Sequence, residues 1–148
     1  VYSNQPLGQI TEDEIKRSMA SNVKAPILLV STLIDRIKSD KTDIAIVVSS
    51  IADKASTGEA VYGASKWALR GFAKNLQLEF KNLPNRVISF SPGGFQSKLF
   101  VQAIDEDKTK DGSTWMKTED VAKCLKQLLD LPQTMDVSEI TVNRKAIK

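Results

Sequence analysis

The fold is decided by residues 44–66, which read IAIVVSSIADKASTGEAVYGASK. Its first five residues are apolar and mostly β-branched, without alternation, a pattern typical of a strand covered on both faces of a parallel sheet. Residues 51–60 are rich in Asp, Lys, Ser, Thr and Gly and predict a loop. Apolar residues then recur at helical spacing over residues 62–82. The stretch therefore predicts a buried strand followed by a crossover helix.

The residues before this stretch predict one long helix. Thr11 and Glu14 form a capping box, so the helix is expected to begin near Glu12 and to continue to about Ser39. Pro26 predicts a kink, because it has no amide hydrogen to donate to the carbonyl of the residue four positions earlier. The predicted apolar stripe of this helix contains Ile15, Met19, Val23, Ile27, Val30, Ile34 and Ile37.

The residues after it repeat the alternation of strand and helix. A second buried strand is predicted over residues 87–90, ending at Pro92-Gly93-Gly94. Residues 93–117, with the charged run 105–111, show no clear period and predict a long excursion of the kind that is usually functional. Thr118 is predicted to cap a helix with an apolar face of Val121, Cys124, Leu125, Leu128 and Leu129. A last strand is predicted over residues 139–142. The order indicates an α/β fold with a parallel sheet of about three strands and helices on both faces.

The composition excludes several classes of function. The chain has 148 residues, no His, one Cys and a formal charge of +3. Without His, Ser-His-Asp hydrolysis and histidine-ligated metals are excluded, and no metal site is predicted. The single Cys124 cannot form an intrachain disulfide, which favours a reducing, cytoplasmic location. There is no stretch apolar enough to span a membrane, and the basic residues are interleaved with acidic ones, so neither membrane insertion nor nucleic-acid binding is expected.

The candidate chemistry lies where the predicted strands end. In parallel sheets, ligands bind beyond the carboxyl ends of the strands, and Ser49 and Ser50 end the first of them. Tyr62 and Lys66 are four residues apart, so in a helix both side chains lie on one face. A neighbouring ammonium favours the phenolate and is expected to lower the pKa of the tyrosine. With Ser50 hydrogen-bonding a substrate oxygen beside Tyr62, the set is suited to carbonyl reduction without histidine.

These motifs resemble the short-chain dehydrogenase/reductase family, and the likeness covers almost the whole chain. It is carried by the string Tyr62 to Lys66 opening a helix, by the Ser-Ser pair before it, and by Pro92-Gly93 after the next strand. The resemblance implies that Tyr62 is the general acid/base and that Ser50 orients the substrate oxygen. It also implies that Lys66 holds the nicotinamide ribose while lowering the pKa of Tyr62, and that Asn22 holds the water of a proton relay.

The resemblance also implies a cofactor site and leaves one choice open. NAD or NADP would contact Lys66 and Tyr62 together with Pro92, Gly93 and Ser97, which stands where the family has Thr; alternatively, Ser97 only caps a helix at Lys98. The family serine lies about thirteen residues before the tyrosine, whereas Ser50 lies twelve and Ser49 thirteen residues before it. The string Ser-Ser-Ile-Ala favours Ser50, with a one-residue deletion in the loop, and Ser49 is the alternative.

One feature of the family is missing from the sequence. The glycine-rich turn that binds pyrophosphate has no counterpart among the seven glycines. Residues 1–148 are therefore expected to form a single partial Rossmann-like domain, the C-terminal part of a doubly wound sheet without its N-terminal nucleotide-binding half. The function implied is NAD(P)-dependent interconversion of a small-molecule carbonyl and an alcohol, with the isolated chain inactive. The alternative is a non-catalytic remnant or oligomerisation module. In the family, helices corresponding to residues 12–39 and 62–82 pack between subunits, which implies a homodimer or homotetramer.

Overall fold

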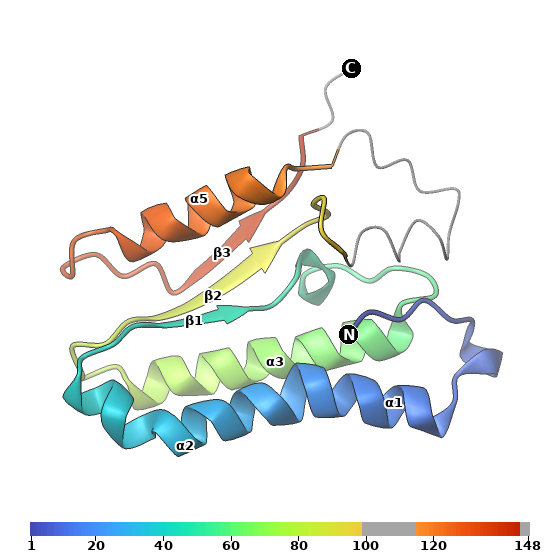
Figure 1. The fold of residues 1–148 in the computed structure, drawn as a ribbon, viewed down its shortest axis with the longest axis horizontal. Coiled ribbons are helices and arrows are strands. Elements are labelled where there is room, and N and C mark those ends of the chain that lie inside the picture. The colour runs from blue at the N-terminus through green and yellow to red at the C-terminus, as the bar shows by residue number, and fades with distance from the viewer. Residues whose placement is uncertain (99–114, 146–148) are drawn as a thin grey trace.

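The fold is built on a three-stranded parallel sheet. The computed structural model describes residues 1–98 and 115–145. The strands are β1 (Ile44–Val47), β2 (Val87–Pro92) and β3 (Glu139–Val142), adjacent in the order β1-β2-β3 (Figure 1). All neighbours are parallel, so each pair is joined by a crossover connection. The predicted α/β fold with a parallel sheet is confirmed.

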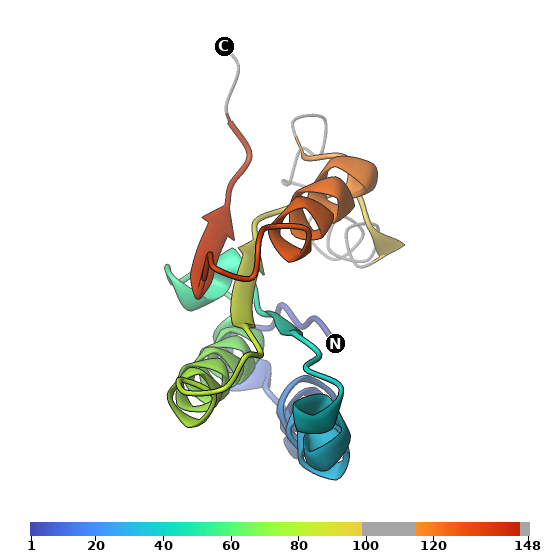
Figure 2. The ribbon, with the colours of Figure 1, turned by 90° about the vertical axis from the view of Figure 1, so that its left-hand side faces the viewer.

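Helices cover both faces of this sheet. The helical segments of the described residues are η1 (Leu7–Gln9), α1 (Glu12–Met19), η2 (Ala20–Lys24), α2 (Ala25–Ser39), η3 (Ser50–Ala52), α3 (Ala60–Glu79) and α5 (Thr118–Leu129). The α1–α2 helix and α3 lie on one face, and α5 lies on the other (Figure 2). Within the parts of the chain that the structure describes, no helix is long and apolar enough to cross a membrane.

The main apolar core lies between the sheet and the helices α2 and α3. It is formed by Val30, Ile44, Ile46, Val48, Ala52, Leu69, Ala73, Leu76, Phe80 and Val87, with Ile34, Ile37 and Phe72 packed against it. On β2, Ile88 on one face is 1% exposed and Ser89 on the other is fully buried, so the central strand is covered on both faces as predicted. The same prediction for the first strand is wrong at Val47, which is 47% exposed. β1 is an edge strand of this sheet, and no described helix covers Val47.

The long N-terminal helix forms with an irregular turn in its middle. Thr11 Oγ1 accepts a hydrogen bond from the Glu14 amide at 3.2 Å, as the capping box predicts. Residues 20–24 form a π turn, in which the amide of Ala25 donates to the carbonyl of Ala20. The irregularity falls just before Pro26, the position of the predicted kink. The predicted apolar stripe is covered only in its second half, because α1 extends beyond the carboxyl ends of the strands (Figure 1). Ile15 is accordingly 44% exposed.

The segment that enters α5 differs from its prediction by one residue. Lys117, not Thr118, is the N-cap, and Thr118 is the first helical residue. The hydroxyl of Thr118 donates to the carbonyl of Gln96, and no described side chain caps this end of the helix. A parallel bridge between Phe95 and Met116 ties together the two ends of the predicted excursion. The charged run 105–111 lies outside the described residues.

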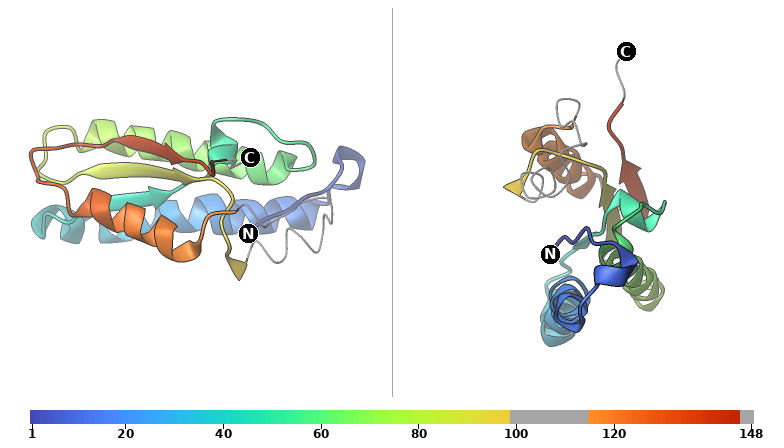
Figure 3. Two further views of the ribbon diagram at one scale, coloured as in Figure 1. Left: turned by 90° about the horizontal axis from the view of Figure 1, so that it is seen from above. Right: turned by 90° about the vertical axis from the view of Figure 1, so that its right-hand side faces the viewer.

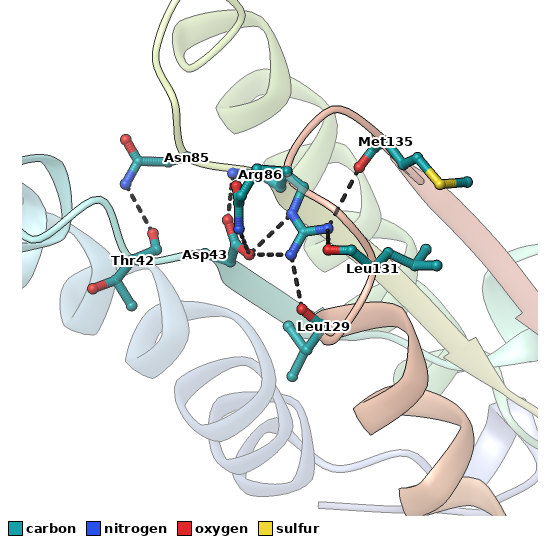
Figure 4. A network of polar contacts seen from close by, with 8 residues as sticks. Thr42, Asp43, Asn85, Arg86, Leu129, Leu131 and Met135 are labelled. Carbon is teal, nitrogen blue, oxygen red and sulfur yellow. Dashed lines mark hydrogen bonds and ion pairs between the residues drawn. The ribbon is translucent and has the colours of Figure 1, made fainter.

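A buried ion pair joins the amino ends of the strands to the end of α5 (Figure 4). Arg86 is 5% exposed, and its guanidinium donates to Asp43 Oδ2 at 2.6 and 3.0 Å. It also donates to the carbonyls of Leu129, Leu131 and Met135 at 2.9, 3.0 and 3.4 Å. Burial acts to raise the pKa of Asp43, but the hydrogen bonds and charge of Arg86 outweigh it and hold that pKa below its usual value. This network lies at the amino ends of the strands, whereas the candidate chemistry lies at their carboxyl ends.

Candidate active site

Tyr62 lies in the first turn of α3, where its ring is buried against the N-terminal segment. The side chain is 8% exposed and packs with Tyr2 and Ile51 in a small apolar cluster. The Tyr2 and Tyr62 rings meet edge to face, with centroids 5.2 Å apart and an interplanar angle of 66°. The Tyr2 hydroxyl donates to Glu59 Oε1 at 2.9 Å. The sequence did not single out Tyr2 or Glu59, because this contact joins residues 57 positions apart.

Lys66 lies one helical turn after Tyr62 and on the same side of α3. Its Nζ is 5.9 Å from the centroid of the Tyr62 ring, so the predicted juxtaposition of phenol and ammonium is confirmed. The same Nζ donates to the carbonyl of Val47 at 3.2 Å, which ties the helix to the end of β1. Burial lowers the pKa of Lys66 to about 8.

The two serines after β1 point to different neighbours. The hydroxyl of Ser49 lies on the Tyr62 side and acts to lower the pKa of that phenol, and its Oγ accepts from the amide of Ile51 at 3.3 Å. Ser50 Oγ instead lies 3.5 Å from the position that a Cβ on Gly93 would take. Successive side chains of extended backbone point in opposite directions, and Ser49 is extended (φ 175°, ψ 152°) just before η3 begins. The structure therefore brings Ser49, rather than the sequence-favoured Ser50, to the phenol.

The pKa of Tyr62 differs from the sequence expectation. It is raised above its ordinary value, because burial of the ring disfavours the phenolate and the Glu59 carboxylate adds to this effect. The hydrogen bond with Ser49 acts in the opposite direction. The expected lowering by Lys66 is not found, and burial is the main cause of the raised pKa. In this structure the hydroxyl of Ser49 is the group that favours the phenolate.

Asn22 reaches the same turn of α3 from the opposite helix. It lies in the π turn η2 and is 7% exposed. Its Nδ2 donates to the carbonyl of Val1 at 2.7 Å and to Ser65 Oγ at 3.0 Å, and its Oδ1 accepts from the Val1 ammonium at 2.7 Å. Ser65 in turn donates to the carbonyl of Tyr62 at 2.7 Å. The sequence analysis did not single out Ser65, although its position directly before Lys66, within the string Tyr62 to Lys66, could have done so.

Gly93 occupies a crowded position where β2 ends. A Cβ there would lie 3.2 Å from Asn143 Oδ1 and 3.4 Å from the carbonyl of Val142. The absence of a side chain therefore allows the end of β2 to approach the end of β3 and Ser50 closely. Pro92 is buried as the last residue of β2, and Ser97 is half-buried on the segment that leads away from it. Asn143, at the end of β3, is a further polar neighbour that the sequence analysis did not name.

The low pKa of Lys66 predicts how stability depends on pH. Between about pH 8 and pH 10 the unfolded chain binds a proton at residue 66 that the folded chain has released. The free energy of unfolding is therefore expected to rise with pH across this window. Above pH 10 the raised pKa of Tyr62 acts in the opposite direction, because the folded state then holds the extra proton.

Urea denaturation at a series of pH values across this window measures the effect. Lys66→Met is expected to abolish the rise, whereas the matched substitution of the exposed Lys16, which is ion-paired with Glu12, leaves it in place. A native protein whose stability is flat or falling across the window contradicts the lowered pKa of Lys66.

Comparison of the sequence with known protein families identifies the family of the chain. The profile of the short chain dehydrogenase family matches residues 1–108. This chain belongs to the short-chain dehydrogenase family. An uncharacterized oxidoreductase of Listeria monocytogenes is 27% identical over 151 residues, covering 96% of this chain and 60% of that protein. The dehydrogenase/reductase SDR family member 4 of Homo sapiens is 31% identical over 105 residues, covering 70% of this chain and 37% of that protein. This short-chain dehydrogenase chain thus spans about 60% of the length of the first of these relatives.

Solved structures share the Rossmann-type fold of this family. A 4-hydroxyisoleucine dehydrogenase complexed with NADH superposes with a TM-score of 0.78 at 25% identity, covering 97% of this chain and 64% of that one. A serine dehydrogenase complexed with NADP+ superposes with a TM-score of 0.83 at 19% identity, covering 96% and 60%. At that identity the second likeness concerns the fold alone.

Proposed function

We propose that this chain carries the acid/base centre of an oxidoreductase that interconverts a carbonyl and an alcohol. The observation that carries the proposal is the buried phenol of Tyr62, held between the Ser49 hydroxyl and the Lys66 ammonium where the parallel strands end. The Tyr62 hydroxyl gives a proton to the substrate oxygen during reduction and takes one during oxidation. Ser49 orients that oxygen, in the role that the sequence favoured for Ser50.

The residues around Tyr62 fit the nicotinamide end of NAD or NADP. When bound, this cofactor supplies hydride transfer to or from the substrate carbon. Lys66 would donate to its ribose hydroxyls, and the segment with Pro92, Gly93 and Ser97 would contact the same end of the cofactor. The pyrophosphate has no matching glycine-rich turn in the sequence. The 4-hydroxyisoleucine dehydrogenase complexed with NADH supports a cofactor of this class.

In this proposal Asn22 positions the helical turn that carries Tyr62. Its amide holds Ser65, and Ser65 holds the carbonyl of Tyr62, so the π turn fixes the helical turn that carries the phenol. A water molecule bound at Asn22 would exchange protons with Lys66. This would complete the proton path that the family resemblance implies. π turns inserted in long helices occur frequently at functional sites.

The test supplies the nucleotide-binding turn that the sequence lacks. The chain is fused to the glycine-rich segment of a catalytically active family member, and oxidation of NADH and NADPH is followed with a panel of aldehydes and ketones. The fusion is expected to turn over, and the 148-residue chain alone is expected to be inactive, because orientation of the hydride donor supplies much of the rate.

The alternative is a non-catalytic remnant or oligomerisation module. A fusion that folds and binds NADH but reduces no carbonyl compound supports that alternative and contradicts the proposal. Titration of the chain alone, followed by nicotinamide fluorescence, adds an independent measurement. Saturable binding in the micromolar range excludes a remnant that has lost its cofactor site.

We also propose that residues 1–148 form one partial domain, located in the cytoplasm, that associates as a homodimer or homotetramer. Apolar side chains are exposed on the outer faces of α2 and α3. They are Leu28 at 53%, Leu29 at 61%, Trp67 at 51% and Leu78 at 73% exposure. A second copy of the chain would cover these faces, as the family resemblance implies for helices 12–39 and 62–82.

Sedimentation velocity tests this association. The native chain is expected to sediment as a dimer or tetramer, and Leu29→Glu is expected to shift it to monomer by placing a charge in the interface. The matched control is Asp35→Glu on the same helix, which changes no apolar group. A native chain that is monomeric at all concentrations overturns this part of the proposal.

A further inference from the structure

Arg70 joins three elements around the turn that carries the serines. It lies on α3, one turn after Lys66, and its side chain is 19% exposed. Its Nη1 donates to the carbonyl of Ala52 at 2.7 Å and lies 2.8 Å from Asp53 Oδ1. Its Nε donates to Glu139 Oε1 on β3 at 2.5 Å. One guanidinium therefore connects α3, the end of η3 and the start of β3.

The opposite side of the turn is held as well. The hydroxyl of Thr141, on β3, donates to Asp53 Oδ2 at 2.5 Å. Both oxygens of Asp53 are thereby engaged, one from the helix and one from the sheet. Figures 2 and 3 show η3 beside the carboxyl end of β3 and next to α3.

The turn transmits these contacts to Ser49. The amide of Ala52 donates to the carbonyl of Ser49 at 3.0 Å, and the carbonyl of the same Ala52 accepts from Arg70. A shift of the Ala52 and Asp53 backbone would therefore move Ser49. Among the described residues, Arg70 forms no hydrogen bond or ion pair with Tyr62 or Lys66, so any influence on the phenol passes through this turn.

We propose that Arg70 is a positioning residue that fixes the η3 turn between α3 and β3 and so holds the Ser49 hydroxyl beside Tyr62. A role of Arg70 in catalysis rests on the proposed function. Its effect on the position of Ser49 can be measured in the absence of any enzymatic activity. The planar guanidinium donates in several fixed directions at once, which a lysine ammonium of the same charge does not reproduce. Arg70→Lys therefore separates geometry from charge.

The test uses the ionisation of Tyr62 in the 148-residue chain. Tyr2 and Tyr62 are the only two tyrosines, so Tyr2→Phe gives a protein whose phenolate absorbance reports Tyr62 alone. In this background, Arg70→Lys is expected to raise the pKa of Tyr62 by about one pH unit, because the hydrogen bond from Ser49 to the phenolate is loosened. Ser49→Ala is expected to raise it by the same amount.

The double variant decides between positioning and general destabilisation. With Ser49→Ala already present, Arg70→Lys is expected to cause no further change, because both substitutions remove the same interaction. The exposed Arg36→Lys, on α2, is the matched control and is expected to leave the titration unchanged. Circular dichroism confirms that each variant is folded over the titrated range. If Arg70→Lys does not fold, Asp53→Asn weakens the same turn from its other side and is expected to give the same shift.

An unchanged titration in Arg70→Lys, or shifts that add in the double variant, overturns the proposal. These outcomes are distinct from failure of the proposed function. An inactive fusion with the expected shifts rejects the activity and keeps the positioning role. An active fusion with unchanged titrations rejects only the role of Arg70.

Discussion

Tyr62→Phe in the active fusion is expected to lower turnover about a thousandfold and to leave the affinity for NADH nearly unchanged. The substitution removes one hydroxyl and keeps the ring that packs edge-on against Tyr2. The shape of the site and the ammonium of Lys66 are retained, so the group that binds the ribose is not disturbed. What is lost is the proton that the substrate oxygen exchanges.

The measurement is steady-state turnover together with a fluorescence titration of NADH. Ser49→Ala is expected to lower turnover about a hundredfold, since it removes the hydroxyl that orients the substrate oxygen. Ser50→Ala is expected to have a much smaller effect, because its hydroxyl lies toward Gly93. The reverse order of the two serines would restore the choice that the sequence favoured. Unchanged turnover in Tyr62→Phe would remove the acid/base role.

Arg86→Met is expected to lower the free energy of unfolding by about 3–5 kcal/mol. The substitution leaves the Asp43 carboxylate, whose side chain is only 12% exposed, without its guanidinium partner. It also removes the donors of three carbonyls at the end of α5 and the loop after it. Buried acceptors without partners are costly, because they have lost their hydrogen bonds to water. The expected change is a large fraction of the stability of a domain of this size.

Urea denaturation compares this variant with a matched one. Arg36→Met breaks the pair with Asp40 on α2, whose side chains are 81% and 52% exposed, and is expected to change the free energy by no more than about 0.5 kcal/mol. Adding Asp43→Leu to Arg86→Met is expected to recover part of the loss, because the unpaired buried charge is removed with it. A loss below about 1 kcal/mol for Arg86→Met contradicts the structural role of the network.

The sequence by itself determined the elements and their order. Residues 44–47 and 87–92 form strands because their β-branched and apolar runs match a sheet covered by helices, and β3 spans the predicted residues 139–142. The Tyr62 and Lys66 pair could be predicted because four-residue spacing in a helix is a local geometric property. Pro26 likewise marked the irregular turn, since the lack of an amide hydrogen is a property of the residue itself.

The tertiary structure decided which groups meet. The choice between Ser49 and Ser50 depends on the backbone angles where β1 leads into η3, and these angles direct the Ser50 hydroxyl toward Gly93. The pKa of Tyr62 is raised because its ring is buried, and one of the residues packed against it is Tyr2, sixty residues away in the sequence. Arg86 reaches carbonyls more than forty residues away that no local pattern connects to it. Periodicity and residue spacing determine the secondary structure of a segment, because they depend on local geometry. Burial and hydrogen bonding between segments depend instead on which segments pack against one another.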